Sequence, residues 1–222
     1  MGSPRLAFVA LVLASALAVA QSGSSNSSKS KTNPTPAAPG FDPGGISDGV
    51  YRNLSFAFSY KIPFGWVERT GEMQGEEMQG DDSTASNARV LLAIFERPPD
   101  APGHTINSAV VVAAEKISNY PGLKTAADYF GPLAQLTAAK GFKGVSGPDE
   151  FAVGTKKLMR GDFVKDMPGA SNDASNVKDK LTMQQSSLVE LDHGYIVSFT
   201  FIAGDEDEVE ELIGNLSFVG RK

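Results

Sequence analysis

Two short apolar runs, close together in the chain, most restrict the folds open to this sequence. Residues 88–99 read ARVLLAIFERPP and residues 108–117 read SAVVVAAEKI. Each run has the length of a strand and is apolar on both faces. The turn-forming PDAPGH between them predicts that the two strands are antiparallel neighbours. Because a strand that is apolar on both faces must be covered on both sides, we expect a sheet that is buried on both faces.

Residues 55–62 alternate between apolar and polar side chains, which predicts a half-buried strand that Pro63 ends. Its large side chains share one face and are expected to line a core: Phe56, Phe58, Tyr60 and Ile62. Three nearby aromatic residues lie outside this alternation. They are the candidates for a partner-binding surface, although for Trp66 a core position is an open alternative: Tyr51, Phe64 and Trp66.

The rest of the domain predicts both helices and strands. Thr125 and Asp128 have the spacing of a helix capping box, and the Gly-Pro pair at 131–132 is expected to kink or split the helix that follows. An Asp-His-Gly turn at 192–194 marks the clearest hairpin. The polar, glycine-rich residues 71–88 are expected to form a surface loop. The other expected elements are a first helix at 125–141, one or two strands within 151–164, a hairpin at 181–204 and a closing helix at 205–219.

The front of the chain predicts export. Residues 1–20 have a positive charge, an apolar run and a small-x-small ending, which together indicate a secretory signal cleaved after Ala20. Residues 21–48 are rich in Ser, Asn and Pro and are expected to form a disordered tether. Residues 49–222 are then one domain in the periplasm or outside the cell. No other run is long enough to cross a membrane, so we expect no transmembrane span in the mature chain.

The composition rules out several kinds of chemistry and disfavours one class of partner. The chain has no cysteine, so it can form no disulfide and has no thiolate nucleophile. Its formal net charge is -6, and no basic stripe is present. A protein that binds nucleic acid carries such a stripe, so we expect no nucleic-acid partner.

Acidic residues offer a possible metal site but lack the usual spacing. The segment 72–82 is rich in carboxylates, yet it does not follow the alternating pattern of a calcium loop. The four acids at 205–208 are expected to begin a helix, where negative charge is favourable. We therefore assign no metal ligand and no cofactor, and we keep a small-ligand or metal-binding protein as an alternative. The acidic residues of the segment are Glu72, Glu76, Glu77, Asp81 and Asp82.

A hydrolase is a further alternative, and it would need a site assembled from scattered residues. Ser175 and Lys178 match the S-x-x-K pattern, but they stand in a polar loop without the motifs that accompany it in penicillin-binding enzymes. The two histidines, His104 and His193, fall in predicted turns, and Asp192 precedes the second. We assign no catalytic residue.

The opening YRNLSFAFSYKIPFGWVE resembles the start of PsbP-like proteins. A mid-chain helix around AADYFGPLAQL and the closing GYIVSFTFIAGDEDEVEELIGNLSF agree with that superfamily. The resemblance implies an α+β fold, with an antiparallel β-sheet flanked by helices in an α/β/α sandwich. It also implies a protein that binds partners or assists assembly and is not an enzyme. We therefore expect an exported binding or complex-assembly module with a protein partner.

Overall fold

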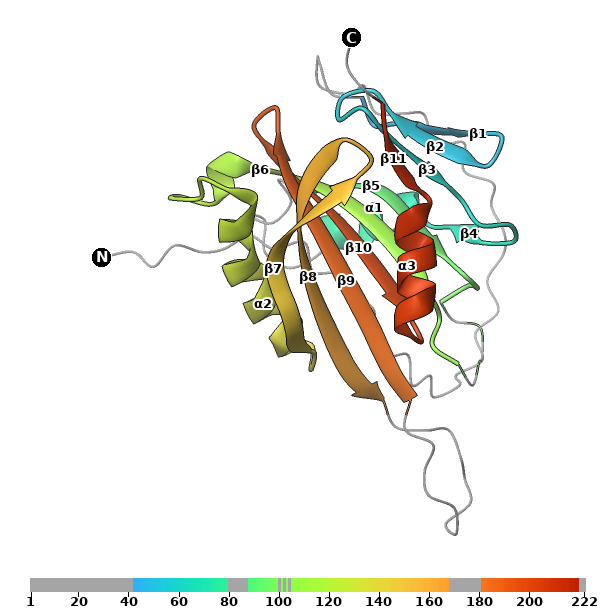
Figure 1. Ribbon diagram of the computed structural model, residues 1–222. Helices are drawn as coiled ribbons and strands as arrows, with labels where there is room; N and C mark the ends of the chain where they lie inside the picture. Colours follow the sequence, from blue (N-terminus) through green and yellow to red (C-terminus); the bar gives the residue numbers. More distant parts are fainter. Residues whose placement is uncertain are drawn as a thin grey trace.

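The structure is a computed structural model that describes residues 42–79, 88–99, 101, 103, 105–167 and 181–219. The signal segment, its cleavage site after Ala20 and most of the expected tether lie outside these residues. Two antiparallel sheets make up most of the described fold (Figure 1). The chain is therefore an α+β protein built mainly from antiparallel sheet.

The larger sheet has seven strands in the order β4-β5-β6-β10-β9-β8-β7. The two apolar runs form β5 and β6, which pair antiparallel as predicted. The predicted hairpin is also confirmed, because His193 and Gly194 both have positive φ and join β9 to β10. The strands are β4 (Val67–Glu68), β5 (Ala88–Phe95), β6 (Ala109–Lys116), β7 (Lys143–Val153), β8 (Lys156–Met167), β9 (Leu181–Asp192) and β10 (Tyr195–Ala203).

The smaller sheet has four strands in the order β1-β2-β3-β11. The strand predicted over 55–62 was predicted to begin too early, because β3 begins only at Phe58. Residues 50–53 already form a strand, and Ala57, with φ 53°, turns the chain back between the two strands. The first strand lies upstream of Gly49, so the sheet includes residues that the sequence assigns to the tether. The strands are β1 (Gly45–Ser47), β2 (Val50–Asn53), β3 (Phe58–Lys61) and β11 (Leu216–Phe218).

Helices connect and cover the strands. The loop predicted at 71–88 is wrong in its first half, because α1 (Thr70–Gln79) occupies it. The helix predicted at 125–141 is split, but the break lies just ahead of 131–132: the 3-10 turn η2 (Ala126–Tyr129) leads directly into α2 (Phe130–Ala139), which includes the Gly-Pro pair in its first turn. No helix among the described residues is long and apolar enough to cross a membrane. The remaining helices are the 3-10 turn η1 (Ile117–Asn119) and α3 (Glu206–Gly214). The closing helix predicted at 205–219 is wrong in its last part, because residues 216–218 leave the helix and pair with β3 as a strand.

The central strands β5, β6 and β10 are buried on both faces, as predicted for the two apolar runs, whereas the edge strand β7 is largely exposed. On one face, Phe199 packs edge-on against Phe58 of the small sheet at 5.0 Å between ring centroids, and residues of α3 belong to the same core cluster. On the other face, Val111 and Ile202 pack near Met73 of α1. At the far end of that face, Tyr129 and the start of α2 belong to a third apolar cluster.

At one end of the large sheet, two hairpins diverge (Figure 1). The pairing of β8 with β9 ends at Met159 and Val189, whereas β8 continues to pair with β7, and β9 with β10, beyond that point. Lys156 and Glu190 form an ion pair across the gap. A cavity of about 290 Å³ lies at this fork, beside the start of η2.

Candidate functional site

Phe64 is the most exposed large apolar side chain in the described chain, with a relative exposure of 105%. It lies in a turn in which the Trp66 N–H donates to the Pro63 carbonyl at 3.3 Å. Gly65 follows Phe64 with φ 86°, a conformation that glycine adopts without strain. The turn therefore directs the phenyl ring of Phe64 into solvent.

Backbone bonds on the N-terminal side and packing on the C-terminal side fix this turn to the fold. The N–H of Ile62 donates to the Gly49 carbonyl at 2.8 Å, and the N–H of Lys61 donates to the Asn215 carbonyl at 3.0 Å. Trp66 is half-buried and packs against the main core cluster. Phe64 thus projects from a short loop whose two ends are held by different parts of the core.

Tyr51, the third aromatic candidate, lies in the core. Its side chain is 2% exposed, and its hydroxyl donates to the Pro43 carbonyl at 2.9 Å. Burial raises the pKa of Tyr51 to about 12, although a hydrogen bond from Asn53 opposes the shift. The structure therefore places Phe64 and Trp66 two residues apart in one turn and separates Tyr51 from the surface.

A buried carboxyl group, which sequence analysis did not single out, lies on the opposite side of the large sheet from the four-stranded sheet. Glu115 on β6 is 2% exposed. Tyr129 Oη donates to its Oε1 at 2.6 Å, and Tyr120 Oη donates to its Oε2. Burial raises the pKa of Glu115, while the two tyrosine hydrogen bonds act in the opposite direction. The sequence signal for this site was an acid, followed directly by Lys116, near the end of an otherwise apolar strand run.

A small cavity of about 50 Å³, lined by both apolar and polar side chains, lies between α2 and the sheet, and Glu115 forms part of its lining. Its floor includes Ser198 and Thr200, which lie on β10 opposite Ala113 and Val111 of β6. Its wall includes Thr137 of α2. The volume is sufficient for water rather than for a larger molecule.

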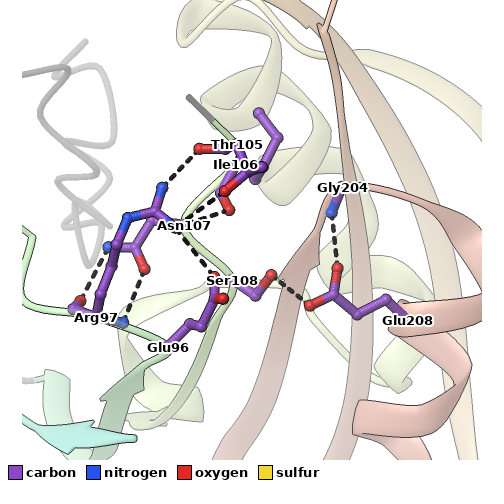
Figure 2. Close-up of polar contacts among 8 residues, drawn as sticks. All are labelled: Glu96, Arg97, Thr105, Ile106, Asn107, Ser108, Gly204 and Glu208. Carbon is purple, nitrogen blue, oxygen red and sulfur yellow. Dashed lines mark hydrogen bonds and ion pairs between the residues drawn. The ribbon is translucent and has the colours of Figure 1, made fainter. Parts of the chain in front are cut away.

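The acidic start of α3 has a structural role, as predicted. Asp205 caps the helix by accepting from the Glu208 N–H at 2.8 Å. Glu208 in turn accepts from the hydroxyl of Ser108 at 2.6 Å and from the Gly204 N–H at 3.2 Å (Figure 2). These bonds attach the first turn of α3 to the beginning of β6.

Figure 2 also shows how the segment between β5 and β6 is closed. The backbone N–H of Arg97 donates to Asn107 Oδ1 at 3.1 Å, and Asn107 Nδ2 donates back to the Arg97 carbonyl at 3.0 Å. The Arg97 guanidinium donates to the Thr105 carbonyl at 2.6 Å. These bonds join residues at the two ends of the same segment, so we interpret the cluster as structural.

The residues of the other candidate sites do not come together within the described chain. His193 Nδ1 lies 2.7 Å from Asp192 Oδ1 in an exposed hairpin turn, while Ser175, Lys178 and His104 lie outside the described residues. In the acidic segment, Glu72 pairs with Arg69, and the side chains of Glu76, Glu77, Asp81 and Asp82 lie outside the description. Among described residues, no group of three or more metal-ligating acids, histidines or cysteines is present.

No family model matches the chain, and no curated protein matches it in sequence. A solved structure of a protein from Bacteroides thetaiotaomicron VPI-5482 is 11% identical, with a TM-score of 0.35, and the match covers 78% of this chain and 48% of that one. The match therefore spans about half the length of the Bacteroides chain. LpqN of Mycobacterium tuberculosis, described as involved in cell envelope biogenesis, is 11% identical, with a TM-score of 0.36 and coverage of 73% and 83%. The resemblance to the PsbP-like superfamily stays a prediction.

Proposed function

We propose that this chain is an exported, non-enzymatic binding or complex-assembly module that contacts a protein partner through the turn at 63–66. The observation that carries this proposal is the full exposure of Phe64 in a turn whose flanks are fixed to the core. The proposal includes the signal segment 1–20, the tether 21–48 and a helix-flanked, PsbP-like α/β/α arrangement of the domain.

An exposed aromatic ring on an ordered turn favours binding. Burying a phenylalanine side chain on binding contributes about 1.5–3 kcal/mol. Because the turn is already ordered by bonds at Lys61 and Ile62, little backbone entropy is lost when a partner covers it. Aromatic residues in such positions are typical anchors of protein interfaces.

Single exposed apolar residues are common on soluble proteins, so the proposal needs a control residue. Leu54 supplies it, because it is 82% exposed in a different turn, between β2 and β3. If exposure alone caused association, Leu54 and Phe64 would behave alike. A specific partner distinguishes them.

The test places p-benzoylphenylalanine at position 64, and separately at position 54, of the full chain expressed in the exporting cell. Irradiation is expected to yield a discrete cross-linked protein from position 64 and none from position 54. With the photoprobe at position 61, where Lys61 is exposed, Phe64→Ala is expected to abolish the adduct while leaving the melting temperature unchanged. Equal adducts from positions 64 and 54, or no adduct from 64, would contradict the proposal.

A further inference from the structure

The fork between β8 and β9, where the two hairpins diverge, interrupts the large sheet and contains a cavity of about 290 Å³ (Figure 1). Pairing of the two strands ends at Met159 and Val189, so residues 156–158 and 190–192 each have a neighbouring strand on one side only. An apolar cavity of about 150 Å³ in a protein core holds one benzene molecule. The cavity at the fork is therefore large enough for a small organic molecule.

Apolar residues make up more than half of the cavity lining. β8 contributes Leu158 and Met159, and β9 contributes Val189 and Leu191. The start of η2 adds the small side chains of residues 126 and 127. A ligand that fills this cavity therefore needs an apolar body.

Four charged side chains complete the lining, and their charges cancel. Lys156 and Glu190 form an inner ion pair at 2.5 Å, in which the Glu190 side chain is 3% exposed. Lys157 and Glu150 form an outer pair at 2.9 Å, and both of these side chains are more than half exposed. A buried carboxylate such as that of Glu190 is costly unless a cation lies beside it. The inner pair therefore sets the charge that a ligand must carry.

Lys156 covers the Glu190 carboxylate from the side of the small sheet. Its Nζ atom lies 5.5 Å from the ring centroid of Phe218 on β11, whereas η2 bounds the cavity on the other side. The Lys156 side chain is 35% exposed, and a lysine ammonium group is carried on a flexible four-carbon stem. A rotation of this side chain moves the ammonium group away from Glu190 without breaking any pairing between strands.

We propose that the fork binds a small zwitterion with an apolar side chain, of the class of the apolar α-amino acids. The ammonium group of the ligand pairs with Glu190 and its carboxylate pairs with Lys156, so that the ligand is inserted into the inner ion pair. Its side chain occupies the apolar part of the cavity. The inference is independent of the partner-binding turn at 63–66.

The charges of the inner pair distinguish a zwitterion from the other classes of small ligand. An anion that entered the cavity would lie against the buried Glu190 carboxylate and be repelled. A cation would displace the Lys156 ammonium group and leave that group without its partner. A neutral ligand would replace neither charge. A zwitterion alone keeps every charge of the pair beside an opposite one.

The test uses ligands that share one apolar body and differ in charge. L-Leucine is the zwitterion, 3-methylbutylamine lacks its carboxylate, and 4-methylpentanoate lacks its ammonium group. NMR titration of the full chain at neutral pH follows the backbone amides of Met159 and Leu191 at the cavity, with Val110 at the opposite end of the sheet as reference.

L-Leucine is expected to give saturable shifts at the cavity amides and none at Val110. Each analogue is expected to bind at least about tenfold more weakly, because it lacks one partner of a buried charge. Equal affinities for the three compounds would show an apolar cavity without charge selection and would overturn the proposal. The absence of saturable shifts with millimolar L-leucine and with millimolar L-methionine would overturn it as well.

Two variants test the inner pair itself. Lys156→Met combined with Glu190→Leu replaces both charges by apolar side chains, a change that a fold often tolerates, and it should remove the preference for L-leucine over the analogues. Lys143→Ala, at an exposed position at the far end of β7, should keep that preference. A preference that persists in the double variant would contradict the proposal.

The single variant Lys156→Ala decides if the double variant does not fold. It leaves the buried Glu190 carboxylate without its lysine, so an added amine takes the place of the ammonium group. The affinity for 3-methylbutylamine should then rise at least about tenfold over that of the wild type, while the affinity for 4-methylpentanoate should not rise. An amine affinity that stays unchanged would equally overturn the assignment of Glu190 as the group that binds the ligand's ammonium.

Discussion

The ammonium group of Lys156 lies 2.5 Å from Oε2 of Glu190, across the gap that opens where β8 and β9 stop pairing. The Glu190 side chain is 3% exposed, while that of Lys156 is 35% exposed. Lys156 Nζ also lies 5.5 Å from the ring centroid of Phe218 on β11. The ion pair thus links the two diverging hairpins, and Lys156 also contacts the small sheet.

Removing Lys156 should cost more stability than removing its neighbour. Lys156→Ala takes the ammonium partner away from a buried carboxylate, and we expect a loss of about 2 kcal/mol, less than for a fully buried pair because Lys156 is partly exposed. Lys157→Ala is the matched control. Lys157 pairs with Glu150 at 2.9 Å, but both side chains are more than half exposed, so the expected loss is at most about 1 kcal/mol. Urea unfolding measures both values, and equal losses would show that burial of Glu190 does not matter.

Trp66 and Phe64 should differ in what their removal changes. Trp66→Ala deletes an indole that packs against the main core, so we expect a loss of about 2–3 kcal/mol. Phe64→Ala deletes a ring with no burial, and we expect stability to change by less than about 0.5 kcal/mol. Thermal unfolding of the two variants decides. A Trp66→Ala variant that melts like wild type would refute the core role of the indole.

Gly161 should tolerate no side chain. A Cβ atom at this position would lie 2.5 Å from Cε1 of Phe130, so Gly161→Ala forces the ring of a buried residue to move. Overpacking of this kind costs about 1–3 kcal/mol, and here the cost should fall on the attachment of α2. Gly144→Ala on β7 is the control, because a Cβ there meets nothing within 4 Å. Unfolding free energies and exchange of the α2 amides measure the difference, and an unaffected Gly161→Ala would disprove the close contact.

Asp128 should stabilise the start of η2 at neutral pH and lose this effect in acid. The backbone N–H groups of Lys124 and Thr125 donate to its carboxylate and lower the pKa of Asp128. A lowered pKa adds stability above the ordinary value, and that contribution is lost as the pH falls through the lowered one. Protection of the Tyr129 amide should therefore decrease below about pH 4 in wild type but not in Asp128→Ala. Asp149→Ala, in β7, should behave as wild type. An acid transition that survives in Asp128→Ala would contradict this assignment.

The predictions that succeeded concern residues whose burial follows directly from periodicity. Val110 and Val112 face one core and Val111 the other, so the expected covering of both faces is confirmed. The capping box between Thr125 and Asp128 is also confirmed, because it depends only on neighbouring residues. Local patterns of this kind are visible without any knowledge of distant contacts.

The prediction of a loop at 71–88 failed for a tertiary reason. The glycines in this segment favour a loop, yet α1 forms and is attached to β5 by two side chains. Thr70 Oγ1 accepts from the Ala93 N–H at 3.0 Å, and Gln74 Oε1 accepts from the Val90 N–H at 2.9 Å. These two bonds are not reflected in the spacing of apolar residues along the chain. The sequence pattern therefore could not reveal them.

The candidate sites were partly predictable. The exposed position of Phe64 follows from its place outside the alternation, whereas the burial of Tyr51 depends on β1 and the turn before it. The Glu115 cluster was harder to predict, because two tyrosines reach one carboxyl group from separate turns. Its single sequence signal was an acid inside an apolar run.

The pairing of β3 with β11 determines when the small sheet can be completed. Ser59 lies opposite Ser217, and their side-chain oxygens are 2.9 Å apart, although the two residues are separated by 158 positions in the chain. Until β11 has been synthesised, that edge of β3 therefore has no partner, and the sheet around Phe58 and Tyr60 is incomplete. Contacts between such distant segments slow folding. Three strands of the small sheet are thus synthesised early, yet the sheet is completed only when β11 has been made.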